Sequence, residues 1–155
     1  MKHLFQKRAI ILIFTFVIVL FSGSCDELND SVIPNVPVNL YIDLNIENEL
    51  TVPGNAVFFP NFGFGGVIVY CELPGSYYAF DAACTNDIPS SCSVVKDEEL
   101  EQCPCLLSSP VVTCSCCDSQ FSLLGNGSVL KGPAVSPLKP YSIAFMNSSL
   151  IRVYN

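Results

Sequence analysis

The sequence predicts a small all-β domain, a sandwich or barrel of short strands, and three observations lead to this fold class. Apolar residues alternate with polar ones or fall in short runs rich in β-branched and aromatic side chains. Gly and Pro turns separate these segments at short intervals. Helix signals are nearly absent, and the one candidate is the short charged turn KDEEL at residues 96–100. Many short strands with frequent turns are typical of small sandwiches and barrels.

Four strands are expected in the first half of the chain. Residues 36–44 (VPVNLYIDL) place an apolar residue at every second position, the pattern of a half-buried strand. Residues 56–59 (AVFF) and 66–70 (GVIVY) are short and strand-forming, and PNFGFGG supplies the turn between them. Residues 77–82 (YYAFDA) follow the turn LPGS and complete this set.

Two hairpins are expected in the C-terminal third. Residues 121–124 (FSLL) and 128–130 (SVL) flank GNG, which is a hairpin turn signal. Residues 141–146 (YSIAFM) and 150–154 (LIRVY) flank NSS in the same way. Because hairpin strands pair with each other, these segments predict antiparallel sheet.

Residues 1–24 have the parts of a secretory signal peptide. Basic residues precede an apolar run at residues 9–21, which is too short to cross a bilayer as a permanent helix. The small residues SGS then lead to Cys25, and this arrangement resembles the lipobox of bacterial lipoproteins. The resemblance implies cleavage before Cys25, lipid on its thiol and anchoring in a membrane through that lipid. The alternative is a plain signal peptide cut nearby.

Residues 25–35 are expected to be an acidic tether. Its DELND run resembles the acidic run that sends some Gram-negative lipoproteins to the outer cell surface, and a solvated linker is the alternative. We therefore expect an outer membrane lipoprotein of the cell envelope that faces the periplasm or the cell surface. Disulfides form and persist in that compartment.

The charge of the chain excludes some partners. Its 14 acidic residues outnumber its 7 basic ones, and every acidic residue follows the signal. An acidic protein is not expected to bind nucleic acid or an anionic membrane surface. The sequence does not indicate which envelope protein is the partner or what the oligomeric state is. Residues 36–155 have the length of one ordinary domain.

Cysteines gather in the middle of the chain. Cys25 apart, they form an even set, and an even set in an exported domain predicts a disulfide framework whose connectivity cannot be read from sequence. The set consists of Cys71, Cys84, Cys92, Cys103, Cys105, Cys114, Cys116 and Cys117.

Residues 66–154 resemble a Rieske domain, whose two ligand loops carry Cys-x-His and Cys-x-x-His. FDAACTN looks like the first loop, with Cys84 at the ligand cysteine and Asn86 at the histidine. CSCCDSQF looks like the second, with Cys114 at the ligand cysteine and Cys117 at the histidine. The stretch GSVLKGPAVSPLKPY that follows is the most specific part of the match. The resemblance implies a small Rieske-like β domain with two adjacent cysteine-bearing loops. More narrowly, the chain looks like Rieske-like lipoproteins whose ligand motifs have drifted.

The missing histidines exclude the family's own cofactor. A Rieske cluster is held by two cysteines and two histidines. The only histidine of this chain is His3, inside the expected signal. A true Rieske cluster is therefore impossible within one mature chain.

Two metal sites remain open for the loops. One is a [2Fe–2S] cluster held by Cys84, Cys114 and Cys117, with a fourth thiolate from a neighbour such as Cys116 or Cys92. The other is a structural zinc, for which the Cys-x-x-Cys at 114–117 would be half a site and the CPC pair, Cys103 and Cys105, could offer another pair.

The sequence favours a third interpretation, in which the cysteines form disulfides and no metal is bound. The resemblance implies that Cys116 bonds to Cys92, and that Cys84 with Cys117 or Cys114 closes the former ligand loops. In the chain-entropy model each such bond stabilises the fold by roughly 3 kcal/mol.

Two functions from different classes follow. The favoured one is a disulfide-stabilised envelope lipoprotein with a binding or structural role and no cofactor. The alternative is an electron-transfer protein with a cysteine-ligated cluster, which is at most an electron carrier or oxidoreductase subunit. No catalytic residue is predicted, because a mature chain without histidine cannot form a Ser-His-Asp triad.

Overall fold

The computed structural model describes residues 31–86, 92–95, 106–107 and 109–155. The expected signal peptide, Cys25, Cys103, Cys105 and the helix candidate at 96–100 lie outside the described residues. Within the described part of the chain, no helix has the length and apolar character needed to cross a membrane.

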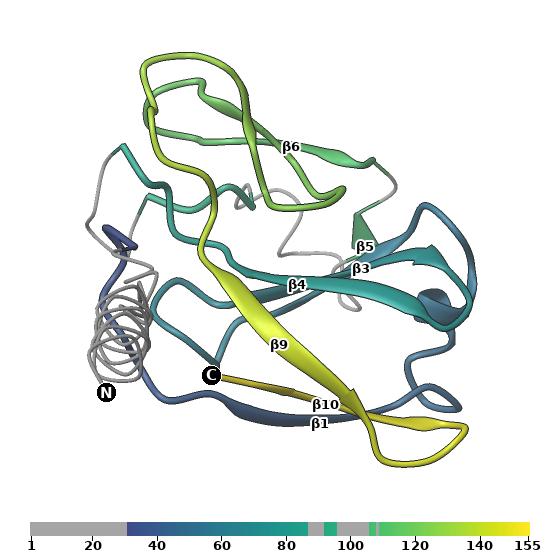
Figure 1. Cartoon of the computed structure of the whole chain (residues 1–155). Helices are drawn as coiled ribbons and strands as arrows, with labels where there is room; N and C mark the ends of the chain where they lie inside the picture. Colours follow the sequence, from purple (N-terminus) through teal and green to yellow (C-terminus); the bar gives the residue numbers. More distant parts are fainter. Residues whose placement is uncertain (1–30, 87–91, 96–105, 108) are drawn as a thin grey trace, which may run out of the picture. The chain divides into compact units, whose positions relative to one another are not determined.

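The described chain is almost entirely antiparallel β structure, in two sheets (Figure 1). The larger sheet has the strand order β1-β10-β9-β4-β3-β2-β5 and the smaller one β6-β7-β8. The strands of the larger sheet are β1 (Asn39–Asp43), β2 (Ala56–Phe59), β3 (Val67–Leu73), β4 (Ser76–Asp81), β5 (Leu106–Leu107), β9 (Pro140–Phe145) and β10 (Leu150–Tyr154). Those of the smaller are β6 (Val111–Thr113), β7 (Gln120–Ser122) and β8 (Val129–Lys131), and a 3-10 helix, η1, spans Asn48–Thr51.

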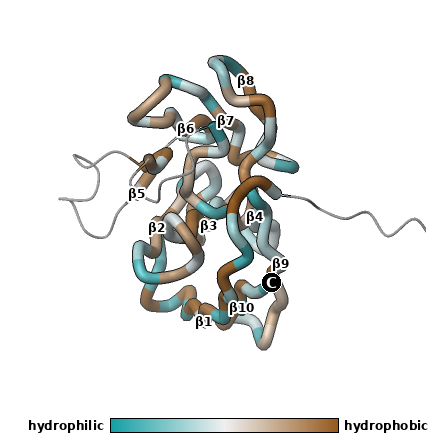
Figure 2. Tube along the Cα trace, turned by 90° about the vertical axis from the view of Figure 1, so that its left-hand side faces the viewer, coloured by the Kyte–Doolittle hydropathy of each residue, from teal (hydrophilic) through white to brown (hydrophobic). Residues whose placement is uncertain are grey.

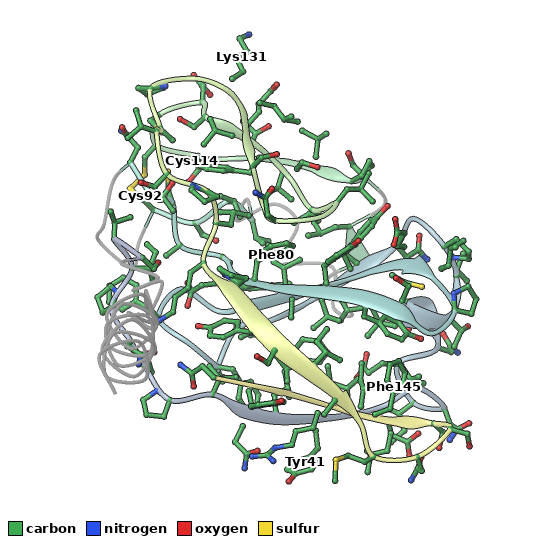
Figure 3. The ribbon with its side chains drawn as sticks, viewed as in Figure 1. Tyr41, Phe80, Cys92, Cys114, Lys131 and Phe145 are labelled. Carbon is green, nitrogen blue, oxygen red and sulfur yellow. A yellow bond between two sulfur atoms is a disulfide. The ribbon has the colours of Figure 1, made fainter. Side chains whose placement is uncertain are left out.

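Two hydrophobic cores lie on opposite faces of β3 and β4. In β3, Val67 and Val69 belong to the core shared with β1 and β10, whereas Ile68 and Tyr70 belong to the core under the small sheet. This division follows from the two-residue period of a strand. Figure 2 colours the chain by hydropathy, with hydrophobic residues in brown. Phe80 of β4 is fully buried and points toward the small sheet (Figure 3). The small sheet is therefore fixed to the larger one through an apolar contact.

The expected strands are present, with small shifts at their ends. β2 spans the predicted residues, and the two C-terminal hairpins form as β7–β8 and β9–β10. The first strand starts at Asn39 rather than at residue 36, because Pro37 has no N–H to give to a sheet. Three elements were not predicted: η1 and β5, which are too short to show a repeating pattern, and β6.

Gly132 lets the segment after β8 pass close to the second cysteine loop. Its φ is +102°, and a Cβ there would lie 2.5 Å from Ser119 Cα. We expect Gly132→Ala to lower the free energy of unfolding by about 2–4 kcal/mol, through a strained backbone and a displaced Ser119. Urea denaturation measures this. Gly75→Ala is the matched control, because Gly75 has a φ of +91° but open space around it. If the two variants lose the same free energy of unfolding, the contact with Ser119 does not contribute to stability.

Candidate thiol and metal site

The first cysteine loop begins where β4 ends. Ala83 forms an isolated bridge with Ser93, and Cys84 N–H donates to the Cys92 carbonyl at 2.8 Å. Ala82 accepts from Val94 N–H at 2.8 Å. These bonds hold Cys84 and Cys92 side by side. The Cys84 side chain is fully buried, whereas Asn86, two residues later, is exposed.

Asp81 anchors the base of this loop. Its carboxylate accepts hydrogen bonds from the backbone N–H groups of Phe64, Gly65 and Ala83 at 2.7–2.9 Å, and from Tyr141 Oη at 2.6 Å. Burial and the adjacent carboxylate both raise the pKa of Tyr141. Asp81 is itself fully buried, so these bonds replace its contacts with water. No role for Asp81 was predicted from the sequence; the available signal was an acidic residue at the end of an apolar strand.

The second loop runs from Cys114 to Ser119, between β6 and β7. Cys114 N–H donates to the Ser119 carbonyl at 2.8 Å, and Asp118 N–H donates to the Cys114 carbonyl at 3.1 Å. Asp118 has a φ of +56°, a left-handed conformation that Asp tolerates better than most residues. Glycine would adopt this turn more readily.

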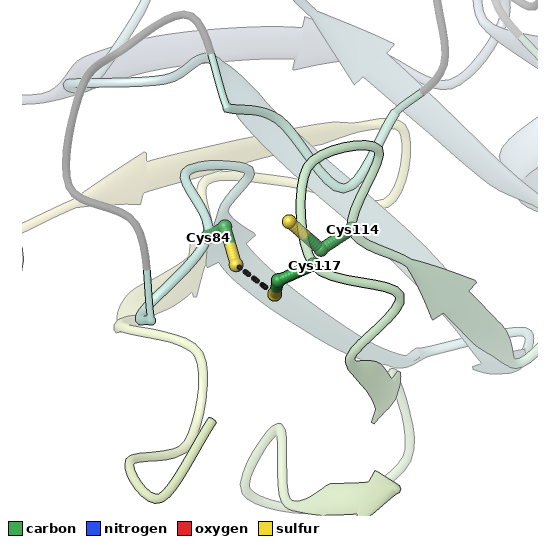
Figure 4. Close-up of side chains that lie close together, drawn as sticks. All are labelled: Cys84, Cys114 and Cys117. Atoms are coloured by element: carbon green, nitrogen blue, oxygen red, sulfur yellow. Dashed lines mark hydrogen bonds between the residues drawn. The ribbon is translucent and has the colours of Figure 1, made fainter. Parts of the chain in front are cut away.

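Three thiols from the two loops lie together (Figure 4). The Sγ atoms of Cys84, Cys114 and Cys117 are within 4.8 Å of one another, and those of Cys84 and Cys117 are 3.5 Å apart. Cys84 and Cys114 are buried, and Cys117 is partly exposed. The group is therefore a cluster of soft donors with one member at the surface.

The thiols of the second loop differ in acidity. Burial, and next the hydrogen bond with Cys84, raise the pKa of Cys114 to about 12. Burial also opposes ionisation of Cys117, but hydrogen bonds with Ser119 and with the other two thiols outweigh it and lower the pKa of Cys117. The Sγ of Cys117 donates to Ser119 Oγ at 3.1 Å in the thiol form, and that hydroxyl also accepts from Ala134 N–H at 3.1 Å. Ser119 thus ties Cys117 to the segment after β8.

A disulfide beside the thiols joins the two loops. Cys92 and Cys116 are bonded, with their Cα atoms 5.7 Å apart, and the yellow bond near the Cys92 label marks it in Figure 3. The resemblance implied this pair. Two other expectations are not met. Neither Cys92 nor Cys116 can be the fourth thiolate ligand while they are bonded to each other. Cys84 forms no bond with Cys114 or Cys117, because its contact of 3.5 Å with Cys117 is far longer than a disulfide of about 2.05 Å.

Cys71, the remaining free cysteine of the described residues, lies elsewhere. It is buried in the core shared with β1 and β10, on the face of β3 turned away from the thiol group. Burial raises its pKa. Cys71 is therefore a natural control for experiments on the three site thiols.

We expect loss of the disulfide to lower the free energy of unfolding by about 3 kcal/mol, since it closes a 24-residue separation. The double variant Cys92→Ser, Cys116→Ser avoids leaving a stray thiol, and urea denaturation under non-reducing conditions measures the loss. If reduction of the unchanged protein causes no comparable loss, the bond does not constrain the chain.

Similar folds occur among solved structures. A chain in the structure of the complex of reduced oxygenase and oxidized ferredoxin in carbazole 1,9a-dioxygenase is 18% identical, with a TM-score of 0.50, over 75% of this chain and 93% of that one. The protein described by this sequence therefore has a Rieske-like fold. The ferredoxin of carbazole 1,9a-dioxygenase from Nocardioides aromaticivorans IC177 is 19% identical over 77% of this chain and 97% of its own, with a TM-score of 0.44. A putative NADH-dependent nitrite reductase small subunit from Mycobacterium tuberculosis is 17% identical over 78% and 97%, with a TM-score of 0.43.

At this level of identity the likeness establishes the fold and leaves the cofactor to be argued from the residues of this chain. The sequence matches no protein-family model and no curated protein. In the Rieske-like fold described here, the two cysteine-bearing loops are adjacent, as the sequence analysis expected.

Proposed function

We propose that this chain is an electron carrier of the cell envelope whose loop thiolates hold an iron–sulfur cluster. The observation that carries the proposal is the group of three Sγ atoms within 4.8 Å of one another, supplied by Cys84, Cys114 and Cys117 on adjacent loops of a Rieske-like fold. Thiolates are the usual ligands of such clusters.

The donor set fits a thiolate-ligated cluster and does not fit a Rieske cluster. The only histidine is His3, so the imidazole half of a Rieske site has no donor. Three thiolates leave one ligand to be found. It would come from Cys103 or Cys105, which lie outside the described residues. A bound all-cysteine [2Fe–2S] cluster would supply one-electron chemistry near −400 mV.

The chain's own residues are arranged for that role. The buried thiols Cys84 and Cys114 keep water from one side of the site, while the partly exposed Cys117 offers a short path to a partner. When Cys117 is a thiolate, the Ser119 hydroxyl that now accepts from its thiol would instead donate to the sulfur and stabilise the negative charge. Hydrogen bonds to ligand sulfurs tune the potentials of clusters.

Metal analysis tests the proposal. The full chain, purified without oxygen, is expected to contain about two irons and two acid-labile sulfides per chain, with visible absorption that bleaches on reduction. Stoichiometric zinc, with thiols freed on chelation, would contradict it. So would a metal-free protein purified with its thiols reduced.

A disulfide-stabilised envelope protein without a metal is the second candidate, and the Cys92–Cys116 bond favours it. In that case the fold would serve a binding or structural role. Iron-free protein in which the bond persists is the result this candidate predicts.

The proposed location is the cell envelope, with lipid on Cys25. The support is the apolar run followed by SGSC in the sequence. Cys25→Ser should release the protein from the membrane fraction. A variant that stays there with an unchanged mass would contradict the lipid anchor.

A further inference from the structure

Two of the site thiols touch although they come from distant parts of the chain. Cys84 Sγ and Cys117 Sγ are 3.5 Å apart and their residues are 33 positions apart in sequence. Both are free thiols. The contact needs to shorten only to about 2.05 Å to become a disulfide.

The neighbouring bonds hold this pair in place. The Cys92–Cys116 disulfide joins the same two loops, Cys116 precedes Cys117 directly, and Cys84 N–H donates to the Cys92 carbonyl at 2.8 Å. Little chain entropy remains to be lost when the second bond closes, and a high effective concentration of one thiol near the other favours it.

The two thiols differ in access. Cys84 and Cys114 are fully buried, whereas Cys117 is partly exposed, so an outside molecule can reach Cys117 alone among the three. Cys84 is then in position to react with whatever bonds to Cys117.

We propose that the metal-free chain carries a second activity, a dithiol–disulfide couple formed by Cys84 and Cys117 that exchanges with the disulfide of another molecule. The Cys117 thiolate attacks one sulfur of that disulfide, whose S–S bond breaks and releases one thiolate, which takes up a proton. A mixed disulfide remains on Cys117. The Cys84 thiolate then attacks Cys117 Sγ and releases the second thiol. Two electrons pass from the chain, which becomes the Cys84–Cys117 disulfide, to the outside disulfide, which becomes two thiols.

Oxidised glutathione is the probe, applied to the full chain after removal of metal. Digestion before Asp81 and Asp87 separates Cys84 from Cys92, so a peptide of residues 81–86 linked to the one that contains Cys116 and Cys117 reports the new bond. We expect this link to form, to reverse with reduced glutathione, and to persist in Cys71→Ala.

The variants assign the order of attack. Cys84→Ser should accumulate one glutathione on Cys117, because the second attack is missing, whereas Cys117→Ser should react at least tenfold more slowly and carry no adduct at Cys84. Circular dichroism shows whether each variant is folded. Because Cys117 is partly exposed, its replacement by Ser should leave the fold intact. A link from residues 81–86 that survives in Cys117→Ser, or that is lost in Cys71→Ala, would overturn the proposal.

This couple does not depend on the proposed cluster. An iron-free protein would remove the electron-carrier proposal and leave the exchange to be measured. A cluster-containing protein should be protected from glutathione until the metal is removed, since both thiols would then be ligands. If the metal-free chain forms no Cys84–Cys117 bond, the couple is wrong whatever the iron content.

Discussion

Asp81→Asn is expected to lower the free energy of unfolding by about 3–5 kcal/mol, the largest loss from a single substitution of a polar group that we foresee. The two carboxylate oxygens of Asp81 accept four hydrogen bonds, three of them from backbone N–H groups. An amide has one oxygen, so its NH₂ would face donors in a fully buried place. Buried groups left without a partner cost more than a hydrogen bond contributes. Urea or thermal denaturation measures the loss.

Tyr141→Phe is the matched control for this prediction. It removes only the 2.6 Å bond from Tyr141 Oη and leaves the three backbone bonds in place, so about 1–2 kcal/mol is expected. Since Asp81 also accepts from Ala83 N–H, next to Cys84, Asp81→Asn should loosen the first cysteine loop as well. Equal losses for the two variants would mean that Asp81 does not anchor the loop.

Cys117→Ala is expected to lower the iron content of the anaerobically purified chain at least tenfold. Cys117 is one of three thiols within 4.8 Å of one another and the only one of them at the surface, so its loss opens the site and removes a ligand. Its replacement should cost little stability, because the side chain is only partly buried. Iron and sulfide analysis, with visible absorption, measures the change.

Cys71→Ala is the control for the loss of iron. Cys71 is a buried free thiol in the other core, so this variant also lacks one cysteine but keeps the three site thiols. Its iron content should equal that of the unchanged protein. If both variants lose iron equally, the metal is not held by the loop thiols.

The strands could be predicted because their pattern is local. The alternation in residues 36–44 and the apolar runs at 56–59 and 66–70 follow from the two-residue period of a strand and from side-chain shape. The two-residue strand β5 and the four-residue 3-10 helix η1 could not be predicted, since neither is long enough to repeat its pattern. The strand β6 was predictable in principle, because its VVT sequence is rich in β-branched residues.

The candidate site could be predicted only in part from the sequence. The chain has one histidine, His3, whereas a Rieske cluster needs two, and this sequence fact by itself excludes such a cluster within one chain. The Sγ atoms of Cys84 and Cys117 lie 3.5 Å apart, although the two residues are distant in sequence. No local sequence pattern predicts such a contact, and only the resemblance to Rieske domains led us to expect the two loops to be adjacent. The anchoring role of Asp81 depends on backbone groups of residues 64 and 65 and on Tyr141, which its own sequence neighbourhood does not reveal.

Electron paramagnetic resonance of the reduced, anaerobically purified chain tests the central claim most directly, which is that the three loop thiols hold a [2Fe–2S] cluster. One added electron leaves a [2Fe–2S] cluster with a single unpaired spin, so the account predicts a low-temperature signal that integrates to about one spin per chain and is lost in Cys117→Ala. It also predicts a reduction potential near −400 mV, far below that of histidine-ligated clusters. Full-length protein that shows no such signal, and that contains zinc or no metal in its place, would contradict the account.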